Sequence, residues 1–273
     1  MTISPTTPPT EELQTRLAFA ATNTMPCAKL ALQWFGKDTF TPDHKSDGTP
    51  VTIADQTIET ELRNRITNDF PNDGILGEEF PDKDGTNEYQ WVIDPIDGTI
   101  SFVQGIPLFG TMLACLHNGV PVLGAIAMPC LDELVYAATG LGCFHKVCDD
   151  APKPARVSSV DRLSDALVNT TALTYFTTPQ QRALYEQIDT QSKHTRGFPD
   201  CYGIVLLATG RVDAVIEPNV ALWDIASVPP IIHEAGGIST DLAGRDTVHT
   251  NSLLAATPSV HAELRRLTTA HIS

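Results

Sequence analysis

Residues 90–110 read QWVIDPIDGTISFVQGIPLFG, with DPIDGT (residues 94–99) at the centre. The apolar residues 91–93 predict a buried strand, and two acids, Asp94 and Asp97, lie at its end. A carboxylate that leaves water in such a place must be compensated by a partner. The candidate partners are a basic side chain, the donors of a turn or a metal ion.

The residues between and behind the two acids favour a tight turn. Pro95 restricts the backbone, so that both carboxylates and the carbonyl of Ile96 can converge on one point. Gly98 allows a sharp bend, and Thr99 can cap a helix or hydrogen-bond a water. Two carboxylates and a carbonyl are oxygen ligands of the kind that Mg²⁺ takes. From these residues alone, a Mg²⁺ site and a capped turn between strand and helix both remain open.

Three further acids stand at the ends of predicted elements, where sites tend to be built. Glu78 follows a short predicted strand, Asp55 opens a predicted helix, and Asp224 follows Trp223 at the start of another. Each of them alone would be interpreted as a helix cap or an exposed acid. Together with the acids of DPIDGT, they favour the metal site.

The composition limits the kind of partner. The chain has 273 residues, enough for one large domain or two closely joined subdomains. Its 18 Lys and Arg residues against 33 Asp and Glu residues give a formal charge of −15, which repels nucleic acid and anionic lipid. No apolar run is long enough to cross a bilayer, and the first residues, MTISPTTPPT, contain no targeting signal. We therefore expect a cytoplasmic protein with neither a nucleic-acid nor a membrane partner.

The six cysteines form no CxxC pair. Cys143, His145 and Cys148 resemble half of a zinc site, but a structural zinc site needs a fourth ligand and usually a second paired motif. Reduced thiols are the interpretation that we favour.

The first half of the chain combines helical segments with a run of strands. The apolar spacing predicts a helix over residues 10–35, kinked or divided at Pro26, and a second helix from Asp55. Strands are predicted at residues 74–77, 90–93, 108–116, 120–128 and 133–138, with a hairpin at Asn118-Gly119. This run predicts an antiparallel sheet.

The second half alternates between strands and helices, which predicts an α/β arrangement. The predicted strands are residues 166–171 and 214–217; the predicted helices are 179–188, 202–209 and 223–237, the last distorted in its first turns by Pro229-Pro230. A polar, proline-bearing stretch at 149–159 suggests a boundary. We expect an α+β metal-binding subdomain over residues 1–150 and an α/β substrate-side subdomain over residues 151–273.

These motifs together resemble the inositol monophosphatase superfamily of Mg²⁺-dependent, lithium-sensitive phosphatases. The resemblance rests on four pieces: Gly77-Glu78-Glu79, WVIDPIDGTISFVQGIP at 91–107, WDIASVPPIIHEAGG from Trp223, and the order and spacing of KSDGTPVTIADQTIE from Lys45. The resemblance implies a layered αβαβα sandwich, with an antiparallel sheet in the first half and a mixed sheet in the second. It also implies a homodimer.

The resemblance further implies which residues act. The oxygen atoms expected to bind two or three Mg²⁺ ions per subunit belong to Glu78, Asp94, Ile96 (through its carbonyl), Asp97 and Asp224. Asp55 would be a ligand or hold a water at the outer edge, while Thr99, with Glu78, would orient and deprotonate the attacking water. Substrate contacts are expected at Asp97, Gly98, Thr99, Asp200, Glu217 and Asp224. A metal-activated water would attack a small-molecule phosphate monoester in line.

Within this superfamily, the sequence is most similar to the histidinol-phosphate phosphatases. The similarity lies in TISF at 99–102, in PNDGILGEE, and in DCYGIVLLATGRVDAVIEP from Asp200. Histidinol carries an ammonium and a basic imidazole, which carboxylates such as Asp200 and Glu217 would attract. Asp200 can also be read as a helix N-cap, and Ile100 departs from the lysine that is common at its position.

Other substrates and another class of function stay open. Inositol-1-phosphate, fructose 1,6-bisphosphate and 3′-phosphoadenosine phosphates are alternative substrates within the superfamily. An acidic regulatory or binding protein without turnover is the alternative from another class. The complete set of predicted metal and water residues argues against a protein that has lost catalysis.

Overall fold

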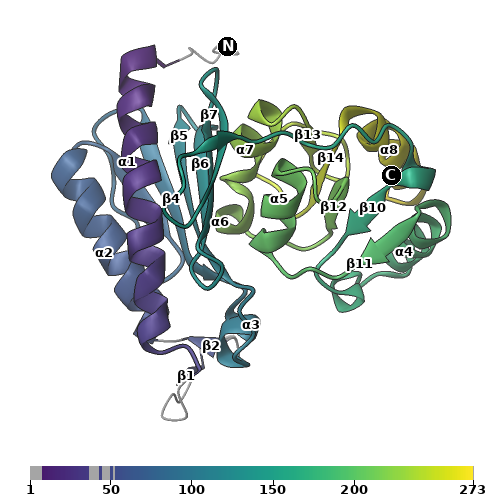
Figure 1. The fold of residues 1–273 in the computed structure, drawn as a ribbon, viewed down its shortest axis with the longest axis horizontal. Coiled ribbons are helices and arrows are strands. Elements are labelled where there is room, and N and C mark those ends of the chain that lie inside the picture. The colour runs from purple at the N-terminus through teal and green to yellow at the C-terminus, as the bar shows by residue number, and fades with distance from the viewer. Residues whose placement is uncertain (1–7, 37–42, 45–49, 52, 273) are drawn as a thin grey trace.

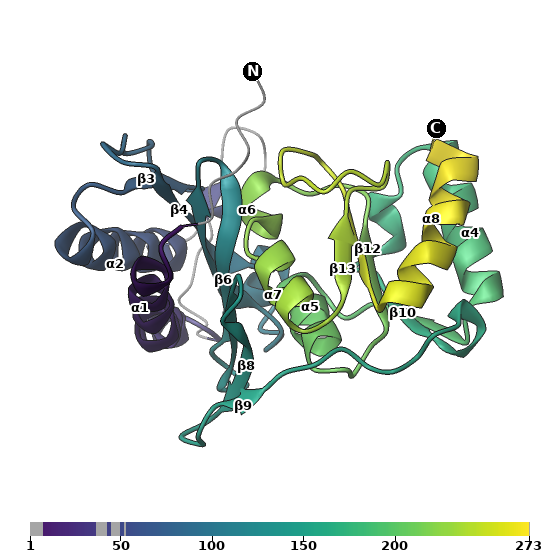
Figure 2. The same cartoon turned by 90° about the horizontal axis from the view of Figure 1, so that it is seen from above.

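The computed structural model describes residues 8–36, 43–44, 50–51 and 53–272, arranged in five layers (Figures 1 and 2). Helices α1 and α2 cover the outer face of one sheet, α5, α6 and α7 lie between the two sheets, and α4 and α8 cover the outer face of the second. The helices are α1 (Thr10–Ala28), α2 (Ile53–Asp69), α4 (Pro179–Gln191), α5 (Cys201–Ala208), α6 (Leu222–Ile225), α7 (Val228–Glu234) and α8 (Pro258–Ile272). The predicted αβαβα sandwich is confirmed.

The first sheet has seven strands in the order β3-β4-β5-β6-β7-β8-β9. Its pairs are antiparallel, as predicted, except that β3 runs parallel to β4. The predicted hairpin at Asn118-Gly119 is present, with positive φ angles of 51° and 77° at these two residues. The strands are β3 (Gly74–Gly77), β4 (Tyr89–Asp97), β5 (Gly110–His117), β6 (Val120–Met128), β7 (Glu133–Ala138), β8 (Gly142–Val147) and β9 (Lys153–Pro154).

The second sheet has five strands in the order β11-β10-β12-β14-β13. It is mixed, as predicted, because β10 runs parallel to both of its neighbours while the remaining pairs are antiparallel. The strands are β10 (Leu167–Asn169), β11 (His194–Arg196), β12 (Ala214–Glu217), β13 (Ile238–Thr240) and β14 (Leu253–Ala256).

Short elements complete the described chain. They are the 3₁₀ helices η1 (Lys29–Gln33), η2 (Leu163–Asp165) and η3 (Leu173–Tyr175), helix α3 (Thr99–Val103), and the strand pair β1 (Asp43–His44) and β2 (Pro50–Val51). None of the helices in the described ranges is long and apolar enough to cross a membrane. Lys45 lies outside the described residues, as do residues 46–49 and 52 of the segment that follows it.

Two of the predicted helices contain prolines, and the prolines have different effects in the two. The helix predicted over residues 10–35 is not divided at Pro26: α1 continues through that residue to Ala28, and the chain then tightens into η1. The single helix predicted from Trp223 to the glycines at 236–237 is instead two helices, α6 and α7. Pro229 and Pro230 have no N–H to continue a helix, and they lie in the first turn of α7, where none is needed.

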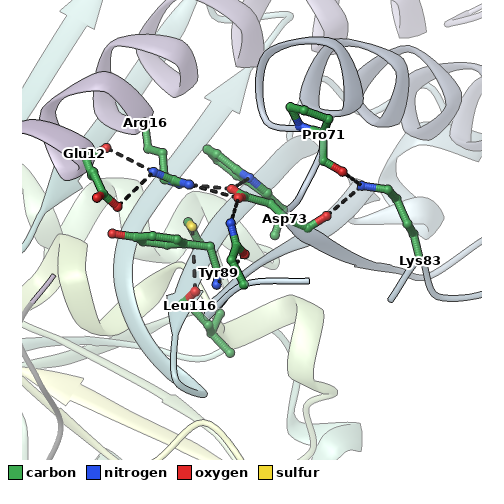
Figure 3. Close-up of polar contacts among 10 residues, drawn as sticks. Glu12, Arg16, Pro71, Asp73, Lys83, Tyr89 and Leu116 are labelled. Atoms are coloured by element: carbon green, nitrogen blue, oxygen red, sulfur yellow. Dashed lines mark hydrogen bonds and ion pairs between the residues drawn. The ribbon is translucent and has the colours of Figure 1, made fainter. Parts of the chain in front are cut away.

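A buried polar network joins α1 to the first sheet (Figure 3). Arg16 donates two hydrogen bonds to Asp73, at 2.9 and 3.0 Å, and its guanidinium lies 3.5 Å from the centre of the Tyr89 ring. Asn87 and the indole N–H of Trp91 donate to the same carboxylate at 2.7 and 2.9 Å. The charge of Asp73 is therefore fully compensated, and the segment between α2 and β3 is tied to both α1 and β4.

One large part of the core lies between the sheets. It includes Met112 and Val135 from the first sheet, and Val205, Ile231 and Ala255 from the middle helices and the second sheet. The division of the chain into subdomains at residue 150 stays a prediction.

Candidate active site

A β-bulge in β4 brings the two acids of DPIDGT together. Asp94 pairs with Met112 and Asp97 pairs with Gly110, so β4 has one more residue than β5 between these pairs. In a regular strand, side chains three residues apart point to opposite faces. Pro95 lies in the bulge, where a missing N–H costs nothing. The expected turn after residue 93 is therefore wrong: the strand continues to Asp97, and the bulge supplies the convergence.

Asp224 completes a cluster of three carboxylates. Oxygen atoms of Asp94, Asp97 and Asp224 all lie within 4.8 Å of one another. Asp224 stands on α6 and accepts a hydrogen bond from the N–H of Ala221 at 2.7 Å. Asp97 accepts one from the N–H of Cys201 at the start of α5. The cluster thus joins the end of β4 to two helices of the middle layer.

The three carboxylates repel one another, and none of them forms an ion pair with a Lys, Arg or His among the described residues. Burial raises the pKa of Asp94 well above its usual range, and the charges of Asp97 and Glu78 raise it further. Burial and the charges of Asp200 and Asp224 do the same to the pKa of Asp97. Asp94 Oδ1 is buried and has no hydrogen-bond partner within the described part of the chain. Oxygen ligands that are crowded, buried and short of donors fit a hard divalent cation.

A cavity of about 370 Å³ opens beside the cluster. Most of the residues predicted to contact substrate or metal line it: Glu78, Asp97, Gly98, Thr99, Asp200, Glu217 and Asp224. Asp94 belongs to the same carboxylate cluster, and the charge of Asp55, which is buried at the start of α2, also raises the pKa of Asp94. The predicted residues therefore gather in one place, and their individual roles stay a prediction.

Thr99 and Ile96 contact each other directly. The Thr99 hydroxyl donates to the Ile96 carbonyl at 3.1 Å. Gly98, with a φ of 89°, stands at the N-cap position of α3, so the possible capping role of Thr99 is not observed. The carbonyl predicted to bind a metal and the hydroxyl predicted to orient a water are thus adjacent.

Glu59 holds the segment that carries Glu78, a role that the sequence reasoning missed. This glutamate on α2 is fully buried, and its carboxylate accepts hydrogen bonds from the Glu79 N–H at 2.8 Å and from Arg63 at 2.7 Å. A Cβ on Gly77 would lie 2.0 Å from Glu59 Oε1, so only glycine allows this approach. Glu59 therefore positions the backbone on both sides of Glu78.

Two further acids, Asp200 and Glu217, line the cavity, and both are predicted to contact the substrate. Burial raises the pKa of Asp200 to about 6, helped by the charge of Asp224. Burial raises the pKa of Glu217 to about 8, although the N–H of Thr171 opposes the shift with a hydrogen bond of 2.6 Å. Asp200 occupies the N-cap position of α5, but its side chain makes no capping hydrogen bond. Its carboxylate is therefore not used by the helix.

The sequence reasoning also missed Thr171 and Tyr175, which line the cavity. The strand predicted over residues 166–171, in the α/β half of the chain, could have identified Thr171. Thr171 follows β10, a strand that runs parallel to both neighbours, and ligands bind outside the carboxyl ends of such strands.

The fold and the site define a phosphoric monoester hydrolase of a known class. The chain matches the inositol monophosphatase family over residues 12–273, and it belongs to this family. It is 39% identical over 220 residues to the histidinol-phosphatase of Chlorobaculum parvum, covering 81% of this chain and 83% of that one. It is 36% identical over 230 residues to the histidinol-phosphatase of Mycobacterium tuberculosis, covering 84% of this chain and 88% of that one.

A solved structure shows the same fold. The IMPase of Thermotoga maritima superposes with a TM-score of 0.83 at 27% identity, over 94% of this chain and 98% of that one. The chain is therefore a phosphatase of this family that acts on small phosphate monoesters, and it carries an acidic cluster that could hold a metal ion.

Proposed function

We propose that the protein hydrolyses L-histidinol phosphate to L-histidinol and phosphate in histidine biosynthesis, with two or three Mg²⁺ ions per subunit. The observation that carries the proposal is the pair Asp200 and Glu217. Both acids line the cavity, with Glu217 buried and Asp200 half-buried, and no Lys, Arg or His lines that cavity in the described ranges. Such a pocket is poorly satisfied until a cationic ligand enters it.

The oxygen atoms in and around the carboxylate cluster are suitable ligands for Mg²⁺. The residues that would hold them are Glu78, Asp94, Asp97 and Asp224, together with the Ile96 carbonyl and with Asp55 at the outer edge. Bound Mg²⁺ supplies the positive field that lets a phosphate dianion approach these acids, and it makes a water more acidic. Asp94 Oδ1, which is buried and has no hydrogen-bond partner in the part of the chain that the structure describes, supports this assignment.

The protein's own groups would prepare the water. Thr99 uses its proton on the Ile96 carbonyl, so its oxygen is left to accept a hydrogen bond from a water in the cavity. Glu78, which lines the same cavity, would take the second proton. Together they would aim the oxygen of the water at phosphorus.

The substrate end of the site would recognise the leaving alcohol. The ammonium and imidazole of histidinol offer N–H donors and positive charge, and a charge-assisted hydrogen bond is about twice as strong as a neutral one. Binding a cation also lowers the pKa of a neighbouring carboxyl, so Glu217 would ionise as the substrate enters.

Inositol-1-phosphate is the second candidate substrate, because the structural likeness to the Thermotoga maritima IMPase covers nearly the whole chain. A Mg²⁺-dependent phosphate-release assay with histidinol phosphate, inositol-1-phosphate and fructose 1,6-bisphosphate separates these substrates. A binding protein without turnover would release phosphate from none of them. The homodimer belongs to the same proposal, and light scattering tests it.

Asp200→Asn tests the pocket. We expect kcat/KM for histidinol phosphate to fall by about ten- to a hundred-fold, while inositol-1-phosphate loses little. Asp161→Asn, which changes an exposed acid remote in sequence from the cavity-lining residues, serves as the matched control. Equal losses on both substrates would mean that Asp200 supports the fold or the metals, and the histidinol assignment would lose its structural support.

A further inference from the structure

We propose that Thr171 is a positioning residue that fixes both acids of the substrate pocket relative to each other. Thr171 stands just beyond the end of β10, between Asp200 and Glu217. Its backbone N–H donates to Glu217 Oε1 at 2.6 Å, and its hydroxyl oxygen accepts from the N–H of Asp200 at 2.8 Å. One residue therefore contacts both acids through two different groups.

Asp200 needs such a constraint, because its backbone is strained. Its φ of 53° and ψ of −139° lie in a region that residues with a side chain seldom adopt. Backbone strain of this kind persists only where the surroundings over-determine it, and it is concentrated at functional sites. The contact with Thr171 is one part of that over-determination.

Neighbouring residues hold the rest of the segment. The Asn169 side-chain amide forms two hydrogen bonds with the backbone of Phe198, at 2.7 and 3.0 Å. The N–H of Cys201 donates to Asp97. Thr171 contacts Asp200 itself through the Asp200 N–H, so the hydroxyl acts at the residue whose conformation is strained.

The position of the Asp200 carboxylate is sensitive to small movements. A Cβ on Gly98 would lie 2.9 Å from Asp200 Oδ2, so the carboxylate occupies space that only a glycine leaves open. If Asp200 moved, its charge would shift relative to both the DPIDGT segment and Glu217. Thr171 therefore sets the distance between Asp200 and Glu217, the two acids that would bind a substrate with two cationic groups. This inference rests on the proposed function.

The variant Thr171→Val removes the hydroxyl and keeps the shape of the side chain. The Asp200 N–H then loses its acceptor, and the strained backbone is free to relax. We expect the KM for histidinol phosphate to rise about tenfold, with kcat changed by less than about threefold, because the hydroxyl acts on binding rather than on the water. For inositol-1-phosphate, kcat/KM should change by less than about threefold.

Two further variants make this result specific. Thr171→Ser restores the hydroxyl and should restore the KM for histidinol phosphate. In the background of Asp200→Asn, Thr171→Val should add little, because residues that act through one another are not additive. Thr171→Ala, which cannot clash, replaces the valine variant if that protein does not fold.

Hydrogen exchange at the Asp200 amide, followed by NMR on substrate-free and Mg²⁺-free protein, gives a readout that needs no substrate. The amide should be protected in wild type and in Thr171→Ser, and unprotected in Thr171→Val or Thr171→Ala. Unchanged protection, additive effects in the double variant, or equal losses on both esters would each overturn the role of Thr171. A wild-type enzyme that prefers the neutral ester would instead overturn the proposed substrate, and the exchange result would still decide whether Thr171 fixes Asp200.

Discussion

Two buried carboxylates lie close to the same strand, β4, and they have opposite surroundings. Asp73 is 1% exposed and Asp94 is 2% exposed. Asp73 receives hydrogen bonds from Arg16, Asn87 and the Trp91 indole, with donors on both of its oxygens. Asp94, three residues beyond Trp91 on β4, has one oxygen without a hydrogen-bond partner among the described residues and is surrounded by other acids.

The difference separates a structural acid from one that we propose binds a metal ion. A buried charge that is fully paired contributes to the folded state, and removal of one partner is strongly destabilising. A buried acid that lacks hydrogen-bond donors lowers the stability of the ligand-free protein. Its presence therefore points to a ligand that supplies the missing positive charge. Burial alone would not distinguish the two carboxylates; their partners do.

The largest effect is expected at Asp94. Asp94→Asn should lower kcat/KM by about 10³-fold or more, because several kcal/mol of charge stabilisation depend on the metals. The metal-free variant should nevertheless unfold with a free energy about 0.5–2 kcal/mol higher than wild type, since repulsion within the cluster is relieved. Phosphate release at millimolar Mg²⁺ and chemical denaturation in EDTA measure the two effects, with the exposed acid Asp82→Asn as control. Near-normal turnover would refute the metal role.

Removing the partner of Asp73, the paired acid, should lower stability and leave activity unchanged. Arg16→Met leaves the carboxylate of Asp73 buried without its cation, which should lower the free energy of unfolding by about 3–5 kcal/mol. Below the unfolding transition, the folded fraction should keep its kcat. Arg65→Met breaks a more exposed ion pair with Glu61 and should cost no more than about 1 kcal/mol. A stable Arg16→Met protein with lost activity would contradict the distinction between the two clusters.

The pH dependence of metal-free stability should follow two acids that line the cavity, Asp200 and Glu217. The pKa of Asp200 rises from 3.8 to about 6 in the folded protein, and that of Glu217 rises from 4.5 to about 8. The folded state therefore binds more protons than the unfolded chain between about pH 4 and pH 8, so stability is present at the acidic end and is lost as the pH rises.

We expect a decrease of about 1–3 kcal/mol in the free energy of unfolding between pH 5 and pH 8, measured in EDTA. Glu217→Gln should remove much of the part of this slope that lies above pH 6. A stability that increases with pH across this window would show that Asp200 and Glu217 are ionised in the metal-free protein.

The smallest effect is expected at Glu59, a paired acid that contacts the segment carrying Glu78. Glu59→Gln weakens the contacts to Glu79 and Arg63, which should raise the Mg²⁺ concentration at half-maximal activity by about tenfold while kcat at saturating Mg²⁺ changes little. The Mg²⁺-dependent shift in melting temperature without substrate should move in parallel.

Glu61→Gln is the matched control for Glu59, because Glu61 pairs with Arg65 four residues along the same helix and is more exposed. Each variant removes the charge of one glutamate that pairs with an arginine four residues along α2, but only Glu59→Gln should change the response to Mg²⁺. If both variants responded alike, Glu59 would not be a positioning residue for Glu78.

Much of the fold could be predicted, because local patterns act over short distances. The strands at 74–77, 120–128 and 133–138 and the Asn118-Gly119 hairpin depend on apolar runs and on turn residues that are adjacent in the chain. The bulge in β4 could not be predicted in this way, because it depends on the register with β5. The break between α6 and α7 was visible as Pro229-Pro230, although its consequence was underestimated.

The residues of the chain by themselves determined which groups are candidates for the chemistry. Acids, a glycine and a threonine in DPIDGT, with Glu78, Asp55 and Asp224 elsewhere, marked a site of oxygen ligands wherever the fold might place them. Only the tertiary structure decided which acids lack partners and which other residues hold them in place. Glu59 and Thr171 act through hydrogen bonds to segments 20 and 29 or more residues away. Contacts of that range follow from how helices and sheets pack, because no local pattern specifies which distant backbone a side chain will meet.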